Sequence, residues 1–400
     1  MRILSVHNAY QQPGGEDQVF AQEAGLLRSH GHQVVLYEAS NDQVNGGNPL
    51  VLLGNTIWNR RTHQELQALI EREQPDIVHV HNTFSVISPA VYYAAGEAGI
   101  PVVQTLHNYR LLCPTATLFR AGQVCEDCVG RAIPWPGVVH GCYRGSRPAT
   151  AAAAAMLAIH NYKQTWNEAV SAYIALSDFA RDKFIQGGIP AAKIFVKPNF
   201  LEADPGVGDG MGEARGNYAF FAGRLTPEKG ISTLLEAWRK LGAELPLQIA
   251  GDGPMGPQVE RAAAESGQVR WLKWLPRAEI LQKMKDASLL VLPSTWYEGF
   301  PMILAEAFAI GLPVIASDLG SMSSIVDHRR TGLHFRAGCS SDLVDQVRWL
   351  RAHPAEAALM RTQARREYEG KYTGETNYAQ LIGIYESAGA CIDQLIEYDA

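Results

Sequence analysis

The sequence of 400 residues has little of what would place it in several common classes of protein. Six cysteines are too few for a disulfide scaffold, and that scarcity is typical of a reducing compartment. No apolar run reaches the roughly 18 residues of a membrane-spanning helix, and the N-terminus lacks the pattern of a signal peptide. A net charge of −6 provides no positive field for nucleic acid. These absences favour a cytoplasmic globular protein.

The pattern of apolar segments predicts an α/β fold. Short apolar runs alternate with amphipathic stretches, and the first run is followed by a glycine-rich turn and a helix over Asp17–Ser29. Strands that alternate with helices favour a parallel, doubly wound sheet. The expected strands of this sheet are Arg2–Val6, Gln33–Tyr37, Ile77–Val80 and Pro101–Leu106, with a helix start at Ser88-Pro89 between the last two.

The same alternation restarts after Asn199–Gly216, a glycine-rich and acidic segment that is typical of a linker. Because 400 residues exceed one ordinary core, we expect two Rossmann-like domains, over 1–198 and 199–372. We expect a terminal helix over about 373–400 to pack back on the first domain. The expected strands of the second sheet are Tyr218–Phe221, Leu247–Ala250, Val269–Lys273, Leu289–Leu292 and Pro313–Ala316.

The segment FAGRLTPEKG (Phe221–Gly230) places two cations after an expected strand. The strand ends at Gly223, and Arg224 and Lys229 stand five residues apart in the loop that follows. Open α/β sheets bind ligands at the carboxyl ends of their strands. Arg and Lys suit a diphosphate, because the first binds bidentately and the second supplies a point charge. The alternative is an ordinary charged loop at a helix start.

The segment EGFPMILAE (Glu298–Glu306) carries two carboxylates around an apolar helix. Glu306 lies eight residues after Glu298, about two helical turns, so we expect both to face one edge of the domain. In an otherwise apolar helix, a buried Glu306 is costly without a partner, and a ligand rich in hydroxyl groups supplies one. Two solvated glutamates are the alternative. The backbone expected to face the ligand follows at Gly299, Phe300, Pro301 and Met302.

Together with GDGP (Gly251–Pro254) and an N-terminal GGE, these motifs resemble glycosyltransferase family four, a group of GT-B enzymes. The resemblance covers essentially the whole chain. It implies two Rossmann-like domains that face each other across a cleft, hinged near Pro198–Asp204, with a nucleotide-sugar donor on the second domain. It further implies donor-binding roles for Gly223, Asn199 and Gly253, with the backbone of Lys273 and Trp274 near the base.

By motif, the resemblance assigns Glu298 to the donor sugar and Glu306 to the nucleotide ribose. It assigns Arg224 and Lys229 to the diphosphate, where negative charge develops on the departing phosphate.

Three residues of the first domain are further candidates. Gly14 and Gly15 lie between a strand and a helix, where glycines let the backbone approach a phosphate, although a tight turn explains them equally. His107, at the end of a strand, matches the family position for a histidine that touches the donor sugar or its phosphate. Without the family, a structural role for such a histidine is the commoner case.

Three other motifs for nucleotides or for a catalytic metal are incomplete or missing. GDGPMG (Gly251–Gly256) fits the dinucleotide pattern, but no acidic residue ends the next strand, so a nicotinamide enzyme is disfavoured. No G-x-x-x-x-G-K-[ST] motif is present. No two aspartates stand two apart, so we expect no catalytic metal or other cofactor, with cations and helix amides neutralising the diphosphate.

Four cysteines crowd a loop-rich insert of the first domain. Their spacing is C-x11-C-x2-C-x13-C, and four thiolates suit a structural zinc ion, while four reduced, buried thiols are the alternative. The candidate ligands are Cys113, Cys125, Cys128 and Cys142.

After the insert, an alanine-rich helix over Arg147–Trp166 carries aromatic and basic flanks. These flanks allow peripheral contact with the inner face of a membrane, although packing inside the domain is the commoner role of such a helix.

The resemblance implies a retaining hexosyltransferase that needs no metal. We expect a UDP- or GDP-sugar as donor and a glycan or a lipid-linked acceptor, in polysaccharide, lipopolysaccharide or glycolipid synthesis. His107, Arg224, Lys229 and Glu298 are the expected catalytic residues. A nucleotide-sugar epimerase of GT-B fold and a non-catalytic nucleotide-sugar-binding subunit are the alternatives.

Overall fold

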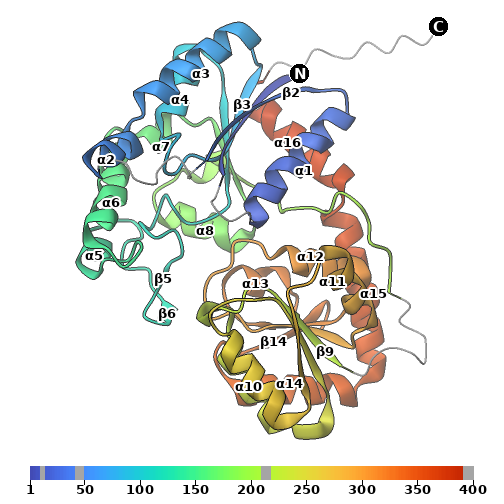
Figure 1. Ribbon diagram of the computed structural model, residues 1–400. Helices are drawn as coiled ribbons and strands as arrows, with labels where there is room; N and C mark the ends of the chain where they lie inside the picture. The colour runs from blue at the N-terminus through green and yellow to red at the C-terminus, as the bar shows by residue number, and fades with distance from the viewer. Residues whose placement is uncertain (10–13, 41–48, 209–217, 391–400) are drawn as a thin grey trace, which may run out of the picture. The chain divides into compact units, whose positions relative to one another are not determined.

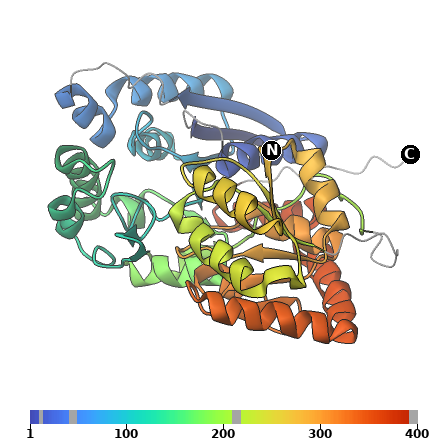
Figure 2. The same ribbon diagram turned by 60° about the horizontal axis from the view of Figure 1, so that its bottom comes forward.

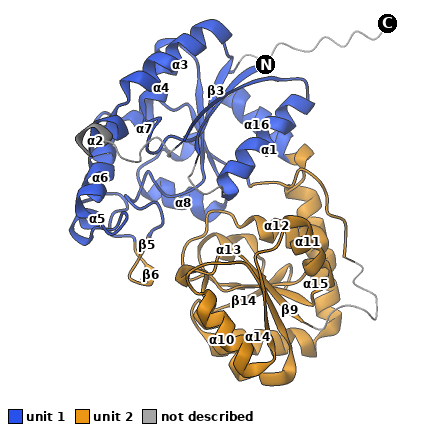
Figure 3. Ribbon diagram, in the orientation of Figure 1, with its two compact units in different colours: residues 1–118, 126–198, 377–400 blue, residues 119–125, 199–376 orange. Residues whose placement is uncertain are grey.

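A computed structural model of the chain describes residues 1–9, 14–40, 49–208 and 218–390. Residues 209–216 of the expected linker and the last ten residues of the expected terminal helix lie outside this description. The chain divides into two compact units, coloured separately in Figure 3. Unit 1 comprises residues 1–118, 126–198 and 377–400, and unit 2 comprises residues 119–125 and 199–376.

Unit 1 contains a six-stranded sheet in which every neighbouring pair is parallel. The strand order is β2-β1-β3-β4-β7-β8. The strands are β1 (Arg2–Ala9), β2 (Gln33–Ser40), β3 (Ile77–Asn82), β4 (Val102–Leu106), β7 (Ala172–Ala175) and β8 (Ile194–Val196). The helices are α1 (Gly15–Ser29), α2 (Pro49–Ile57), α3 (Arg60–Glu73), α4 (Ala90–Glu97), α5 (Trp135–His140), α6 (Arg147–Tyr162), α7 (Thr165–Glu168), α8 (Asp178–Gln186) and most of α16 (Gly374–Ser387).

Helices α1 and α16 share one core against this sheet, side by side in Figure 1. Leu27 of α1 and Leu381 and Tyr385 of α16 are buried together with apolar residues of β1, β3, β4 and β7. Residues from both ends of the chain therefore build the core of unit 1.

Unit 2 contains a second parallel sheet of six strands in the order β11-β10-β9-β12-β13-β14. The strands are β9 (Ala219–Ala222), β10 (Leu247–Ala250), β11 (Val269–Lys273), β12 (Leu289–Leu292), β13 (Val314–Ser317) and β14 (Gly332–Phe335). The helices are α9 (Ile231–Leu241), α10 (Gly256–Ser266), α11 (Arg277–Asp286), α12 (Met302–Ile310), α13 (Gly320–Ile325), α14 (Ser340–Ala352) and α15 (Pro354–Lys371). A short hairpin of β5 (Phe119–Arg120) and β6 (Gln123–Val124) groups with this unit.

Helices cover both faces of the unit 2 sheet, as Figures 1 and 2 show from two directions. Helix α9 packs with α10 and α14, and α12 packs with α11 and α15. This is the doubly wound α/β arrangement that the sequence predicts, and the prediction of two such sheets is confirmed.

The structure differs from the predicted elements at a few positions. Helix α4 begins at Ala90, one residue after the predicted start, with Pro89 as its N-cap residue. The Ser88 hydroxyl still accepts a hydrogen bond from the Ala90 amide (3.3 Å). The sequence analysis did not include β7, β8 and β14, although it did include β9, β10, β12 and β13, which are four residues long.

Within the described residues, no helix is both long enough and apolar enough to cross a membrane.

Candidate functional site

The loops that follow β9 and β12 are held together at the carboxyl edge of the unit 2 sheet. These strands are neighbours although β10 and β11 lie between them in sequence, so the strand order reverses here, which is where open α/β sheets bind ligands. Gly230 has a φ of +72°, and a Cβ there would lie 1.8 Å from the carbonyl oxygen of Pro293. The Thr295 amide donates to the Glu228 carbonyl (2.8 Å). Only glycine permits this close approach of the two loops.

Lys229 and Glu298, predicted from separate motifs, form an ion pair across these loops. Lys229 Nζ lies 2.7 Å from Glu298 Oε1, and the Ser294 hydroxyl donates to the same oxygen (2.6 Å). Glu298 is buried. Burial alone would raise the pKa of Glu298, but Lys229 and the Ser294 hydroxyl hold this pKa below its ordinary value. The site therefore contains a buried carboxylate that stays ionised beside a cation.

The other candidate residues belong to the same two loops. Arg224 is exposed in the loop after β9. Gly299, Phe300 and Pro301 connect Glu298 to α12, which begins at Met302. Phe300 is buried, with its ring 5.6 Å from that of Tyr372. Pro301 has no N–H to offer a ligand, so only the other three amides of this segment are possible donors.

The glycines of GDGP serve a close contact between loops. A Cβ at Gly251 would lie 1.9 Å from the carbonyl oxygen of Gly223, and one at Gly253 would lie 2.6 Å from that of Leu225. The Leu225 amide donates to the Asp252 carbonyl (2.8 Å). These contacts hold the loop that carries Arg224 against the end of β10, which gives GDGP a role other than the dinucleotide fingerprint.

Glu306 lies on α12 and is paired with an arginine that the sequence analysis did not identify. Its Oε1 is 3.0 Å from Nε of Arg277, at the start of α11. Burial raises the pKa of Glu306, and Arg277 opposes that rise only in part. The sequence analysis placed Glu298 before the apolar helix and Glu306 on it, and α12 does begin at Met302, four residues after Glu298. The expectation that Glu306 needs a partner was correct, and Arg277 is one.

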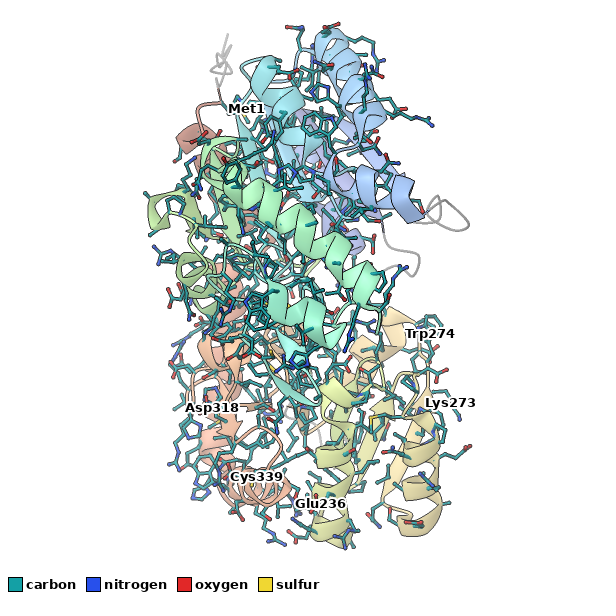
Figure 4. The ribbon with its side chains drawn as sticks, turned by 90° about the vertical axis from the view of Figure 1, so that its left-hand side faces the viewer. Met1, Glu236, Lys273, Trp274, Asp318 and Cys339 are labelled. Atoms are coloured by element: carbon teal, nitrogen blue, oxygen red, sulfur yellow. The ribbon has the colours of Figure 1, made fainter. Side chains whose placement is uncertain are left out.

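The two residues expected near the base lie at the end of β11 and beyond it, and Figure 4 shows both on the same side of unit 2. The Lys273 carbonyl accepts a hydrogen bond from the Gly251 amide (2.7 Å), so this carbonyl is already engaged. Trp274 is 70% exposed, which is unusual for an indole and leaves its ring accessible to a planar ligand. Asn199 is buried, and its Oδ1 accepts no hydrogen bond from the described residues.

In unit 1, the candidate glycines stand at the start of α1. The Gly14 amide donates to Oδ2 of Asp17 (2.7 Å), whose Oδ1 lies 3.0 Å from Nε2 of His7. A Cβ at Gly15 would meet nothing within 4 Å, and neither glycine has a positive φ. Packing therefore does not explain Gly15, and the Gly14 amide is engaged by Asp17 rather than directed at a ligand.

His107 follows β4 and joins a buried cluster of polar residues. Its Nε2 lies 3.0 Å from Nδ1 of His81 on β3. Burial and the neighbouring His81 lower the pKa of His107 well below its ordinary value, so the ring is neutral at pH 7. The signal for this cluster was His-Val-His in β3, since alternate residues of a strand share one face, but it was not used.

The four cysteines of the insert are all described. Cys113 and Cys128 are buried, and Cys125 and Cys142 are partly exposed. Within the described part of the chain, three potential metal ligands converge within 4.8 Å at Glu23, His79 and His81, and the cysteines form no such group. Zinc on the cysteines stays a prediction.

Comparison with known families gives two matches that together span most of the chain. Residues 13–204 match the model described as Glycosyltransferase Family 4, and residues 213–367 match the model described as Glycosyl transferases group 1.

Two characterised relatives align over most of the chain. The phosphatidyl-myo-inositol mannosyltransferase of Mycolicibacterium smegmatis is 28% identical over 80% of this chain and 76% of its own length. The alpha-D-kanosaminyltransferase of Streptomyces kanamyceticus is 25% identical over 84% and 82%.

Among solved structures, the Anabaena protein Alr3699/HepE in complex with UDP superposes with a TM-score of 0.68 at 20% identity. The alignment covers 97% of this chain and 100% of that one. This similarity concerns the fold. Family matches in both halves, relatives over four-fifths of the chain and a shared fold lead to one conclusion: the chain belongs to glycosyltransferase family four and has the GT-B fold.

Proposed function

We propose that this glycosyltransferase moves a hexose from a nucleoside diphosphate sugar to a glycan or lipid acceptor, retains the anomeric configuration and needs no metal. The observation that supports this most is the Lys229–Glu298 pair at the carboxyl ends of β9 and β12. In a donor, the diphosphate and the sugar hydroxyls are adjacent groups, so a cation beside an ionised carboxylate is complementary to both. Arg224 and Lys229 would then stabilise the charge that builds on the departing phosphate.

In the reaction, the bond between the anomeric carbon and the β-phosphate oxygen breaks, and the acceptor oxygen bonds to the same face of that carbon. The acceptor proton passes to the departing phosphate, so no carboxylate base is required. His107, Arg224, Lys229 and Glu298 are the proposed catalytic residues, and the nucleotide ribose is assigned to Glu306.

A UDP-sugar is the first donor to test, because the structurally similar Anabaena protein was crystallised with UDP. Thermal-shift measurements with UDP-, GDP-, ADP- and TDP-sugars would identify the base, since a ligand that binds the native state raises its apparent stability. Transfer should then persist in excess EDTA. Loss of transfer in EDTA with recovery in Mg²⁺ or Mn²⁺ would contradict metal independence. Release of free sugar in the absence of an acceptor would favour the alternative function, a nucleotide-sugar epimerase of GT-B fold.

The surface of α5 and α6 suits a lipid-linked acceptor and peripheral contact at the inner face of a membrane. Large apolar side chains are exposed there, and Arg131 lies over the Trp135 ring (5.5 Å). Beside them is a cavity of about 770 Å³. Its lining includes Trp166, whose buried indole N–H has no hydrogen-bond acceptor among the described residues. The exposed apolar residues are Ile133, Trp135, Val139, Ile159 and Tyr162.

The name of the Mycolicibacterium relative includes a lipid, phosphatidyl-myo-inositol, and an exposed apolar surface would suit an acceptor of that kind. Co-sedimentation with anionic vesicles, compared between the native chain and Trp135→Ser/Tyr162→Ser, tests the contact. Equal binding by both would contradict it.

A structural zinc ion in the cysteine insert is proposed separately, with four thiolate ligands. Metal analysis of protein purified without chelator should give about one zinc per chain, which Cys125→Ser or Cys128→Ser should release. Absence of metal, with all four thiols alkylated in the native state, would contradict it.

A further inference from the structure

A buried cluster in unit 1 connects His107 to a charged pair deep in the domain. Glu23 of α1 has one carboxylate oxygen 2.9 Å from Nζ of Lys197 and the other 3.3 Å from Nε2 of His81. Nδ1 of His81 lies 3.0 Å from Nε2 of His107. Glu23, Lys197 and His81 are each at most 3% exposed. A continuous chain of polar contacts therefore runs from Lys197 to the ring of His107.

At the inner end of this chain of contacts, the carboxylate of Glu23 is ionised. Burial alone would raise the pKa of Glu23, but Lys197 and His79 hold it well below its ordinary value, so the carboxylate is ionised. Lys197 Nζ also donates to Oδ1 of Asn377 on α16 (3.1 Å). The buried ammonium group lies at Oε2 of Glu23 and would repel a second cation at Oε1, where His79 and His81 converge, which argues against these three residues as a metal centre.

The carboxylate determines which nitrogen of His81 carries the proton. Burial lowers the pKa of His81 to about 4, so its ring is neutral and has one N–H. Nε2 of His81 makes no hydrogen bond of good geometry within the described residues, and its ion-pair contact is with Oε1 of Glu23 at 3.3 Å. A lone pair facing an ionised carboxylate is repelled, whereas an N–H is attracted. The proton therefore resides on Nε2, and Nδ1 of His81 is an acceptor.

The protonation of His107 follows from that of His81. Because Nδ1 of His81 accepts, Nε2 of His107 must carry the hydrogen that bridges the 3.0 Å between them. A neutral imidazole has one N–H, so Nδ1 of His107 is left as the acceptor of that ring.

We propose that Glu23 and His81 are positioning residues that fix His107 as the Nε2–H tautomer and so direct an accepting Nδ1 at the donor. An accepting nitrogen pairs with a sugar hydroxyl and repels a phosphate oxygen, so His107 contacts the sugar. The tautomer of His107 is inferred from residues of unit 1 alone. Only the contact between His107 and a sugar rests on the proposed function.

The tautomer is directly measurable in the full chain labelled with ¹⁵N-histidine. Two-dimensional spectra that correlate ring nitrogens with ring protons distinguish a protonated from an unprotonated nitrogen, and His107→Gln identifies the His107 signals. We expect Nε2–H for His107 in the native chain, and a shift toward a mixture of tautomers in His81→Phe. Phenylalanine keeps the ring beside Phe20 (5.2 Å) but has no acceptor nitrogen.

The matched control is His79→Phe. His79 lies on the same strand and its Nδ1 is 3.0 Å from Glu23, but the hydrogen bonds of its ring within the described structure go to Tyr385 and Thr105 and not to His107. This variant should leave the His107 tautomer unchanged. Glu23→Gln should allow both His81 and His107 to adopt a mixture of tautomers. If Glu23→Gln does not fold, His81→Phe alone still tests the proposal.

Transfer kinetics supply the second readout. His81→Phe should lower kcat about two- to tenfold with little change in KM for the nucleotide portion of the donor, as expected when one hydrogen bond is misdirected. Nδ1–H on His107 in the native chain, or an unchanged tautomer in His81→Phe, would overturn the proposal. If no sugar donor is ever turned over while the tautomer behaves as described, the proposed function fails and the positioning of His107 stands.

Discussion

The two units share a parallel six-stranded sheet but organise their charged residues in different ways. In unit 2, Lys229 and Glu298 lie in the loops after β9 and β12, where the strand order reverses, and Glu306 on α12 pairs with Arg277 at the start of α11. In unit 1, the charges are buried along α1, β3 and β8, and Glu23 meets Lys197 across 174 residues of sequence. In unit 2 each buried carboxylate pairs with a partly exposed cation, whereas in unit 1 both partners of the Glu23–Lys197 pair are buried.

The largest expected effect on stability is in unit 1. Glu23→Gln leaves Lys197 buried without its counter-ion, which should cost about 3–5 kcal/mol. Urea unfolding of the native and variant chains measures this. The matched control is Glu65→Gln, which removes a carboxylate paired with exposed Arg61 and should change the unfolding midpoint little. Equal effects for both variants would show that burial does not make the Glu23–Lys197 pair more important to stability than an exposed pair.

The largest expected effect on catalysis is in unit 2. Lys229→Ala and Arg224→Ala should each lower kcat by about 10²-fold, because each removes a preorganised cation from the developing charge. Steady-state kinetics with Lys240→Ala as control measures this, since Lys240 pairs with Glu236 on the surface of α9. An effect confined to KM would indicate uniform binding of the donor and not stabilisation of the transition state.

A backbone substitution tests whether the unit 2 loops need their close approach. Gly230→Ala places a Cβ against the Pro293 carbonyl at a φ of +72° and should destabilise the chain by about 1–3 kcal/mol. Gly383→Ala in α16 meets nothing within 4 Å and should instead stabilise by about 0.5–1 kcal/mol. Thermal unfolding of both variants compares them, and stabilisation by Gly230→Ala would contradict the loop geometry.

A smaller effect distinguishes the two glutamates of unit 2 by pH. The pKa of Glu306 is raised and that of Glu298 is lowered, so on acidification Glu306 should protonate first. The contribution of Glu298 to stability is present above its unfolded pKa and is lost as pH falls through its folded pKa. The raised pKa of Glu306 has the opposite sign, and its contribution becomes more favourable as pH falls. Carboxyl ¹³C titration by NMR measures the order, and the reverse order would contradict the assigned environments.

The difference between the two units also explains which site residues could be predicted from the sequence. The loops of unit 2 that are proposed to bind the donor are contiguous motifs after recognisable strands, so Arg224, Lys229, Glu298 and Glu306 could be selected without coordinates. Arg277 could not, because a helix-start arginine carries no local sign of a partner 29 residues away.

The cluster around His107 was also missed, since Glu23, His81 and Lys197 meet only after β3, α1 and β8 are folded together. Local pattern predicted the sheets, whereas long-range packing determines the buried pairs.

The central claim is that Glu298 and Glu306 bind different parts of one donor, and calorimetric titration tests it most directly. Glu306→Gln should lower the affinity for the free nucleoside diphosphate and for the nucleotide sugar alike, by about ten- to hundredfold, because a charged acceptor of the ribose hydroxyls is lost. Glu298→Gln should leave affinity for the free nucleoside diphosphate nearly unchanged while it reduces turnover. Equal losses for both ligands in both variants would show that the two glutamates are structural and would contradict the assignment of the donor site.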